Sequence, residues 1–369
     1  MTLQLPVEEI ARPISCKAKE CAGFFDHEND HWMKTLTTVK PLPQRKNYTI
    51  GVDIGGTKIA FALIDDTGSV IENKRIPTQL TSGPEMILVE IGKQINLLIK
   101  EYGVNISGIG LATPGYVDTR TGIVKNAVNL NWKDVNVVAI LKNSITASIP
   151  IYLQRDTAAE TLGEHYFGAG KDCQDFVFLG IGTGFGAGAM TSGHLLTGVN
   201  NMALEIGHLS VDQHGPVCAC GNMGCIETVL SGKGLVNRAR DLYSSSSNLE
   251  YSQMLDSITA EWILERAKEH DPIAEELLQH MSKSLGFVCA MLKTILDPER
   301  FIIGGGLGKA IFHFLRFEVE KEMYSRVLKL DNRKIQFFQS SLKTSAMGAA
   351  AMVWYFNGLL PKSIHKNSS

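Results

Sequence analysis

This chain has no uninterrupted apolar run near the roughly 18 residues that a membrane-spanning helix requires. Its first residues also lack the basic-then-apolar layout of a secretory signal. No block of like charges is present, and the net charge of its 369 residues is −2 with histidine neutral. These absences argue against a membrane or a nucleic acid as partner. We therefore expect a cytoplasmic protein that binds small molecules.

Cysteine is scarce, with seven in the chain, which is an odd number and too few for a disulfide scaffold. Three of them nevertheless stand within eight residues, in CACGNMGC, which begins ten residues after His208. One imidazole and three thiolates form the ligand set of a closed structural zinc site, whereas three thiols gathered by chance would be unusual here. The sequence therefore predicts one Zn²⁺ ion held by His208, Cys218, Cys220 and Cys225.

Residues 1–48 have scattered proline, mixed charge and no sustained apolar period. They carry seven basic and six acidic side chains, whereas DNA recognition would want a basic helix. Their two cysteines and two histidines have a spacing that fits no zinc finger. We expect this extension to be a flexible or lightly docked arm.

From Tyr48 onward, strand-like runs are joined by glycine turns. YTIGVDIGGTKIAFALIDDTGSVIENKRIP predicts two or three strands, and a helix over residues 83–103 comes next. DFVFLGIGTGFGAGAMTSGHLL repeats the theme, which indicates an internal duplication. A long helical region from about residue 258 to 296 precedes a third turn, RFIIGGGLG. SAMGAAAMVWYFNGL predicts a closing helix suited to close packing in a core or at a domain seam. This order predicts two related α/β lobes with a ligand cleft between them.

Glycine in such turns lets backbone N–H groups approach an anion closely. One turn alone is as easily a tight hairpin, but three in one chain favour a nucleotide, because a triphosphate and a nucleoside need several clamps. A carboxylate after the first strand can hold hydrated Mg²⁺, and a lysine there either meets phosphate or is solvated. The expected nucleotide-binding residues are Asp53, Gly55, Gly56, Thr57, Lys58, Gly182, Thr183, Gly184, Gly304, Gly305 and Gly306.

Phosphoryl transfer to a hydroxyl needs a carboxylate that accepts the hydroxyl proton. Asp156 is the candidate, because it comes after the apolar run 149–153 and precedes the helix-like TAAETLGEHYF. It therefore lies at or near a helix N-terminus, where capping alone would also favour an aspartate.

Taken together, these motifs resemble a known superfamily. DIGGTK, GIGTGFGAG and IIGGG are similar to the two phosphate segments and the adenosine segment of actin-like ATPases and sugar kinases. EIGH followed by CACGNMGCIE resembles the signature of the ROK family (repressors, open reading frames and kinases), over about residues 48–358. The resemblance implies a two-lobed actin-like ATPase (ribonuclease H-like) α/β fold with an inter-lobe cleft and a structural zinc site. Its parts would be the extension 1–48, a small lobe 49–165 completed by a helix at about 345–358, and a large lobe 166–344 with the nucleotide and zinc sites.

The resemblance also implies residue roles. Asp156 would be the general base, and His208 would bind zinc while its other ring nitrogen faces a sugar hydroxyl. LATPGYVDTRTGIVKNAVNLNW is similar to the sugar-contacting segment of the family. Without the resemblance, these positions would read as an ordinary turn, a polar loop or a protein surface. The expected sugar-binding residues are Gly115, Asn129, Glu205, His208 and Glu227.

Two positions depart from the pattern of the family kinases. Arg155 stands where they commonly have asparagine, and it either lowers the pKa of Asp156 and weakens the base or turns outward without effect. Leu204 stands where many ROK glucokinases have glycine. A bulky residue at this position resembles ROK repressors of the N-acetylglucosamine and xylose type. Such repressors carry a winged helix-turn-helix and often lack an intact DxGGTK, which this chain keeps.

The sequence thus predicts an ATP-dependent hexose kinase that acts on glucose or a close relative, such as mannose or N-acetylmannosamine, at the 6-hydroxyl. ATP, Mg²⁺ and structural Zn²⁺ are its expected cofactors, and the resemblance implies a homodimer. The alternative is a ROK-type regulator that senses sugar without phosphorylating it. A structural actin-like protein has less support, because it gives the cysteines no task.

Overall fold

The structure, a computed structural model, describes residues 47–103, 105–246, 254–328 and 334–359. The predicted extension at residues 1–48 lies outside this part except for its last two residues. None of the helices in the described part combines the length and the hydropathy that crossing a lipid bilayer would require.

The first of two five-stranded sheets has the strand order β3-β2-β1-β4-β8. Three strands form an antiparallel meander, and two more add in parallel on the other side of β1. This agrees with the glycine-linked strands that the sequence predicts from Tyr48 onward. The strands are β1 (Tyr48–Ile54), β2 (Lys58–Asp65), β3 (Val70–Pro77), β4 (Ile106–Thr113) and β8 (Ile151–Arg155).

The second sheet repeats this plan, with the order β11-β10-β9-β12-β13. Again two parallel strands are added to a three-stranded antiparallel meander. The repeated order confirms the internal duplication predicted from the glycine turns. The strands are β9 (Phe176–Ile181), β10 (Phe185–Thr191), β11 (His194–Leu195), β12 (Arg300–Gly304) and β13 (Gln336–Gln339).

The first half carries its own additions. Helix α1 (Gly83–Tyr102) comes after the first meander, begins with Pro84 in its first turn and ends at the left-handed Gly103, as glycine allows. It confirms the helix predicted over 83–103. A three-stranded sheet and a short helix lie between β4 and β8: β5 (Tyr116–Asp118), β6 (Ile123–Ala127), η2 (Val128–Leu130), β7 (Trp132–Asn136) and α2 (Val137–Ser144).

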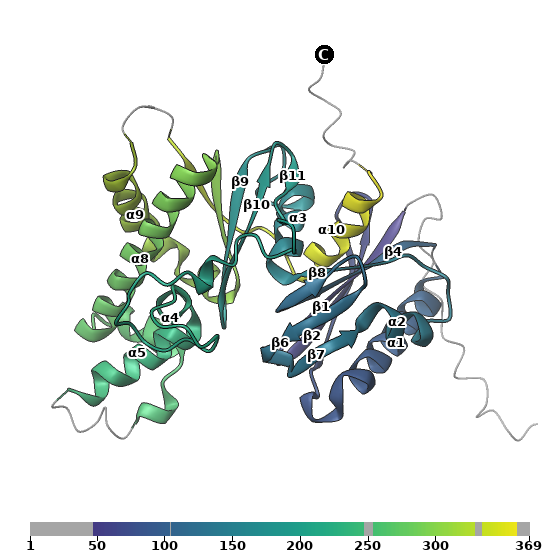
Figure 1. The fold of residues 1–369 in the computed structure, drawn as a ribbon, viewed down its shortest axis with the longest axis horizontal. Coiled ribbons are helices and arrows are strands. Elements are labelled where there is room, and N and C mark those ends of the chain that lie inside the picture. Colours follow the sequence, from purple (N-terminus) through teal and green to yellow (C-terminus); the bar gives the residue numbers. More distant parts are fainter. Residues whose placement is uncertain (1–46, 104, 247–253, 329–333, 360–369) are drawn as a thin grey trace, which may run out of the picture. The chain divides into compact units, whose positions relative to one another are not determined.

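Two helices, α3 (Asp156–Phe167) and α10 (Ala346–Phe356), pack on each other between the sheets (Figure 1). Glycines allow α10 to approach both β4 and α3 closely. A Cβ on Gly110 of β4 would lie 1.7 Å from the carbonyl oxygen of Ala349, and one on Gly163 of α3 would lie 2.8 Å from the Cα of Gly348. The closing helix therefore packs closely, as the sequence predicts, against α3, β1 and β4.

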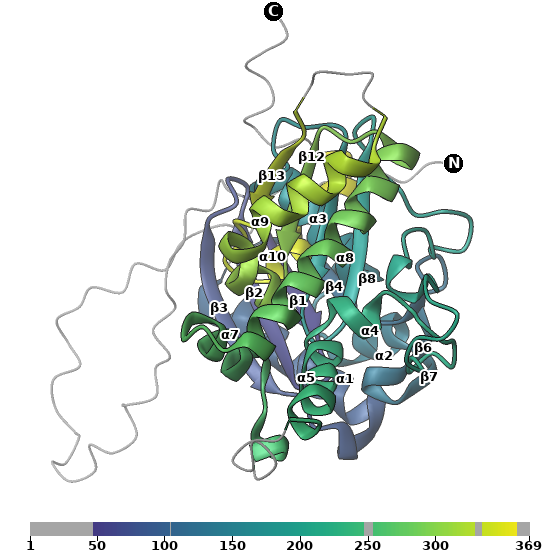
Figure 2. The ribbon, with the colours of Figure 1, turned by 90° about the vertical axis from the view of Figure 1, so that its left-hand side faces the viewer.

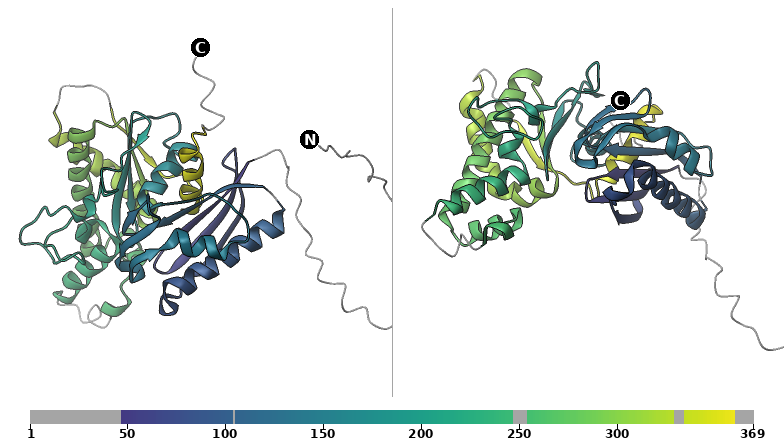
Figure 3. Two further views of the ribbon diagram at one scale, coloured as in Figure 1. Left: turned by 45° about the vertical axis from the view of Figure 1, so that its right-hand side comes forward. Right: turned by 60° about the horizontal axis from the view of Figure 1, so that its bottom comes forward.

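The second half carries most of the helices. In Figures 1 and 2, α8 and α9 cover the face of the second sheet that points away from α10, and both views of Figure 3 agree. The helices are α4 (Glu227–Leu230), α5 (Gly232–Ser244), α7 (Ala260–Lys268), α8 (Pro272–Leu296) and α9 (Gly306–Arg326). The 3-10 turns of this half are η3 (Ile206–His208) and η4 (Leu255–Ser257), whereas η1 (Leu80–Ser82) precedes α1 in the first half.

The helical region predicted from about residue 258 to 296 needs one correction, because it is two helices. His270 is left-handed, with φ 62°, and so ends the first helix. The Asp271 carboxylate accepts the N–H groups of Ile273 and Ala274, and Pro272 occupies the first helical position. Capping aspartate and N-terminal proline both favour a new helix start.

Candidate functional site

The first glycine turn, between β1 and β2, faces a segment of the same half. The Gly55 N–H donates to the carbonyl of Lys58 over 3.0 Å, and the Thr78 hydroxyl donates to the carbonyl of Gly55. A Cβ on Gly56 would lie 2.9 Å from the carbonyl oxygen of Asn129. Predicted phosphate and sugar residues therefore lie side by side here, with Thr57 and Lys58 exposed beside them.

Asp53 lies at the end of β1, partly buried, directly before this turn. Its Oδ2 accepts a hydrogen bond from the hydroxyl of Ser345, at the start of α10. Burial raises the pKa of Asp53, while the Ser345 hydroxyl and the charge of Lys58 oppose the rise. The sequence did not point to Ser345, since it stands 292 residues away and no local pattern links the two.

The second and third glycine turns lie against each other. Gly182 N–H donates to the carbonyl of Gly184, and the start of α5 closes over the turn, where the Gly232 N–H donates to the carbonyl of Gly182. Gly305 has φ 76°, and a Cβ there would lie 2.3 Å from the carbonyl oxygen of Ile181. The structure therefore joins two of the three predicted nucleotide turns directly and places the first beside Asn129.

Glu227, predicted at the sugar, is the first residue of α4. Its Oε2 accepts the backbone N–H of Phe185 over 2.9 Å, and a Cβ on Gly184 would lie 2.7 Å from the same oxygen. The carboxylate thus supports the second glycine turn. Gly115, another predicted sugar residue, has φ 91°, and a Cβ there would lie 2.2 Å from the carbonyl oxygen of Asn126, so only glycine fits.

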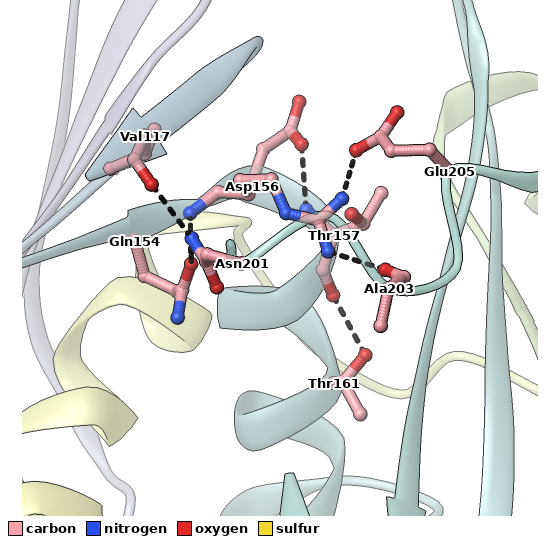
Figure 4. A network of polar contacts seen from close by, with 9 residues as sticks. Val117, Gln154, Asp156, Thr157, Thr161, Asn201, Ala203 and Glu205 are labelled. Carbon is pink, nitrogen blue, oxygen red and sulfur yellow. Dashed lines mark hydrogen bonds and ion pairs between the residues drawn. The ribbon is translucent and has the colours of Figure 1, made fainter. Parts of the chain in front are cut away.

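Asp156 is the first residue of α3, immediately after β8. The N-cap of the helix is Arg155, whose backbone is extended, so Asp156 occupies the first helical position and not the cap itself. Its Oδ1 accepts the N–H of Thr157 over 2.7 Å (Figure 4). Burial, assisted by the charge of Asp53, raises the pKa of Asp156 to about 7. A carboxylate with this pKa can accept a proton near neutral pH.

Of the two alternatives that the sequence offers for Arg155, the outward orientation is wrong, and the lowering of the pKa of Asp156 holds in direction only. Arg155 does not turn outward, because its side chain is 2% exposed and pairs with the carboxylate of Glu205. Its second terminal nitrogen donates to the carbonyl of Ala203 over 2.8 Å. It does oppose the rise in the pKa of Asp156, but it is the smallest influence and the pKa stays raised.

A further carboxylate, Glu160, was missed. It lies four residues after Asp156 and so on the same face of α3. Burial raises its pKa well above the ordinary range, and the charges of Asp53 and Asp156 add to the rise. The helical period alone could have placed Glu160 beside Asp156.

The four predicted zinc ligands come together in the segment that begins with η3 and ends before α4. The Sγ and imidazole nitrogen atoms of His208, Cys218, Cys220 and Cys225 lie within 4.8 Å of one another. His208 Nδ1 is 3.7 Å from Cys218 Sγ, and the Sγ atoms of Cys220 and Cys225 are 3.6 Å apart. Bonds of about 2.0–2.3 Å to one tetrahedral ion imply edges of about 3.3–3.8 Å.

Backbone geometry gathers these ligands. Cys218 N–H donates to the carbonyl of Asn222 and Gly221 N–H to the carbonyl of Cys218, which makes a tight turn inside CACGN. Gly224 has φ 63°, and a Cβ there would lie 1.7 Å from the carbonyl oxygen of Asp212. The donor set and its spacing therefore fit the zinc ion that the sequence predicts.

Comparison with known proteins agrees with this geometry. The sequence pattern of the ROK family matches residues 49–355. A glucokinase from Halalkalibacterium halodurans is 33% identical over 268 residues, which cover 71% of this chain and 81% of that protein. A putative xylose repressor from Caldicellulosiruptor sp. is 29% identical over 314 residues, or 82% of this chain and 77% of the repressor.

Among solved structures, a ROK family glucokinase from Streptomyces griseus in complex with glucose and AMPPNP matches with a TM-score of 0.72. The two sequences are 28% identical, and the match covers 83% of this chain and 99% of the glucokinase. The likeness therefore extends over both sheets described above.

Proposed function

The chain belongs to the ROK family, and we propose that it transfers the γ-phosphoryl group of ATP to the 6-hydroxyl of a hexose. The proposed substrate is glucose or a close relative such as mannose or N-acetylmannosamine. The observation that carries the proposal is Asp156, a partly buried carboxylate at the start of α3 whose pKa is raised to about 7. A glucokinase that is 33% identical supports it.

In this mechanism Asp156 accepts the proton of the 6-hydroxyl while that oxygen bonds to the γ-phosphorus. The bond from the γ-phosphorus to the bridging oxygen breaks, and ADP leaves. Phosphoryl transfer depends chiefly on positioning and on neutralisation of charge. We propose that the three glycine turns and Lys58 hold the phosphates, and that Asp53 holds the Mg²⁺ that accompanies ATP.

The sugar would lie among Gly115, Asn129, Glu205, His208 and Glu227. Because the carboxylate of Glu227 already binds the second glycine turn, we propose that it links the sugar to the ATP side of the site. Zinc, when bound to His208 and the three cysteines, would cross-link the segment before α4 and fix the ring orientation of His208. We also propose a cytoplasmic homodimer.

A second candidate is a sugar-sensing regulator that does not phosphorylate its ligand. The xylose repressor matches a larger share of the chain than the glucokinase does, at 82% against 71%, although at lower identity. The intact Asp53 and first glycine turn favour the kinase, since a regulator has no need to hold a triphosphate.

The test is an ADP-release assay on zinc-replete protein with Mg-ATP and glucose, mannose, fructose, N-acetylglucosamine or N-acetylmannosamine. Turnover on one of the hexoses is the expected result and names the substrate. Sugar binding by calorimetry without any ADP release would overturn the kinase and favour the regulator.

A further inference from the structure

One loop of the second half is bound to the last strand of the first sheet. Residues 197–205, here called the 197–205 loop, lie between β11 and η3, and η3 contains His208. Its Asn201 donates from one Nδ2 to the carbonyl of Val117 over 3.2 Å and to Oε1 of Gln154 over 2.6 Å. Figure 4 shows this network next to Asp156.

Arg155, the next residue of β8, holds the same loop at a second point. It pairs with the carboxylate of Glu205 and donates to the carbonyl of Ala203 over 2.8 Å. Its own backbone N–H donates to Oε1 of Gln154, so both contacts belong to one network. Glu205 is 34% exposed, whereas Arg155 is 2% exposed. The buried cation is thus the fixed partner, and the carboxylate keeps an accessible side.

Two residues of the loop have a left-handed backbone, and at one of them this conformation needs restraint. Asn201 has φ 57° and Leu204 has φ 65°. Asparagine tolerates the left-handed region, but a leucine there is disfavoured by its Cβ. Such a conformation persists only where surrounding contacts hold it. The guanidinium of Arg155 binds the residues on either side of Leu204, Ala203 and Glu205.

We infer that Arg155 is a positioning residue that acts through Glu205. It fixes the 197–205 loop to β8, and so holds the open side of the Glu205 carboxylate beside Asp156, where a sugar hydroxyl would bind. The pair also cancels its own charge, so the accessible side of the Glu205 carboxylate can accept a hydrogen bond from a neutral polyhydroxyl ligand without bringing a net charge to the site. This inference rests on the proposed function for the identity of the ligand, but not for the restraint of the loop.

The first test compares Arg155→Gln, Arg155→Lys and Glu205→Gln by hydrogen exchange of the full zinc-loaded protein. Amides of the 197–205 loop should exchange at least about tenfold faster in Arg155→Gln. Arg155→Lys should lie between this variant and the wild type, because one ammonium cannot reproduce the planar fork. Arg316→Gln, which removes an exposed ion pair with Glu320, is the matched control and should not change the loop.

The second test measures how the variants bind and phosphorylate D-glucose. Calorimetry gives Kd in every case, and KM and kcat are measured where the protein turns over. Arg155→Gln and Glu205→Gln should each weaken glucose binding by about tenfold or more, with less effect on kcat. The double variant should bind glucose no more weakly than the single variant with the lower affinity, because the two residues act as a unit.

Unchanged loop exchange in all three variants would overturn the inference, and so would losses that multiply in the double variant. Should Arg155→Gln fail to fold, Arg155→Lys and Glu205→Gln still decide the question, since both keep the buried cation. A wild-type protein that binds glucose without turnover would refute the kinase alone. A wild type that binds none of the five sugars would refute the sugar site, while hydrogen exchange would still test the restraint of the loop.

Discussion

The two halves of the molecule share one strand order but differ in the segment that each meander leads into. After β3 the first half continues into a single helix, α1, and its sheet ends in β8 and Asp156. After β11 the second half inserts the 197–205 loop, η3 and the His–Cys cluster before α4. The duplicated sheets therefore give two similar frames, and the insertions give each frame its chemistry.

The glycine turns of the two halves are also supported differently. Thr78 and Asn129 contact the first turn, whereas the carboxylate of Glu227 and the start of α5 support the second. Glu227 comes two residues after Cys225, so support of the second turn depends on a segment that a bound metal ion would hold together. We expect the halves to respond very differently to substitution.

The largest effect should come from the metal ligands. Metal analysis should find about one zinc per chain, and Cys220→Ser should lose both zinc and the folded second half, because structural zinc contributes on the order of 10 kcal/mol to folding. Cys173→Ser, a buried cysteine outside the cluster, is the matched control and should keep the metal. Stable, zinc-free protein would contradict the cross-link.

The next largest effect concerns the first half. Asp156→Asn should lower turnover at least about a hundredfold, because the amide cannot accept the hydroxyl proton. Calorimetry should still detect sugar binding, and the fold should remain intact. Asp241→Asn, on the exposed face of α5, serves as control for the same chemical change. If Asp156→Asn kept its turnover, the aspartate would lose its role as base.

Substitutions at the seam between the halves should have an intermediate effect on the free energy of unfolding. Gly110→Ala places a methyl 1.7 Å from the carbonyl oxygen of Ala349, so the free energy of unfolding should fall by about 3 kcal/mol. Gly306→Ala has no atom within 4 Å of the new methyl and should not destabilise the protein. Equal denaturant midpoints for the two variants would show that α10 does not pack closely on β4.

Much of this comparison could be predicted from the sequence, because it depends on local signals. Apolar strand-like runs and glycine turns predicted the meanders, and the cysteine spacing predicted the metal ligands, since all four lie within a short segment. The break between α7 and α8 was missed, although Asp271 and Pro272 form a visible helix start.

Long-range pairs were not predictable in the same way. The contact of Ser345 with Asp53 spans 292 residues, and that of Arg155 with Glu205 spans 50. Arg155 beside an aspartate suggests a lowered pKa, and only the three-dimensional structure shows that burial and Asp53 outweigh it. The left-handed backbone of Leu204 likewise depends on contacts that its own sequence neighbourhood does not reveal.

The smallest expected effect is on pH dependence. Asp156 acts as a base only when ionised, and its pKa is raised to about 7. The value of kcat/KM should therefore be constant above this pH and fall about tenfold per unit below it.

Arg155 lowers this pKa while Glu205 and Asp53 raise it. Arg155→Gln should move the acid limb to higher pH and Glu205→Gln to lower pH, although both weaken sugar binding. Because a general loss of structure would move both limbs the same way, opposite shifts would show that the pair acts electrostatically on the first half. A limb near pH 4 in the wild type would instead mean that Asp156 is hydrated in the free enzyme.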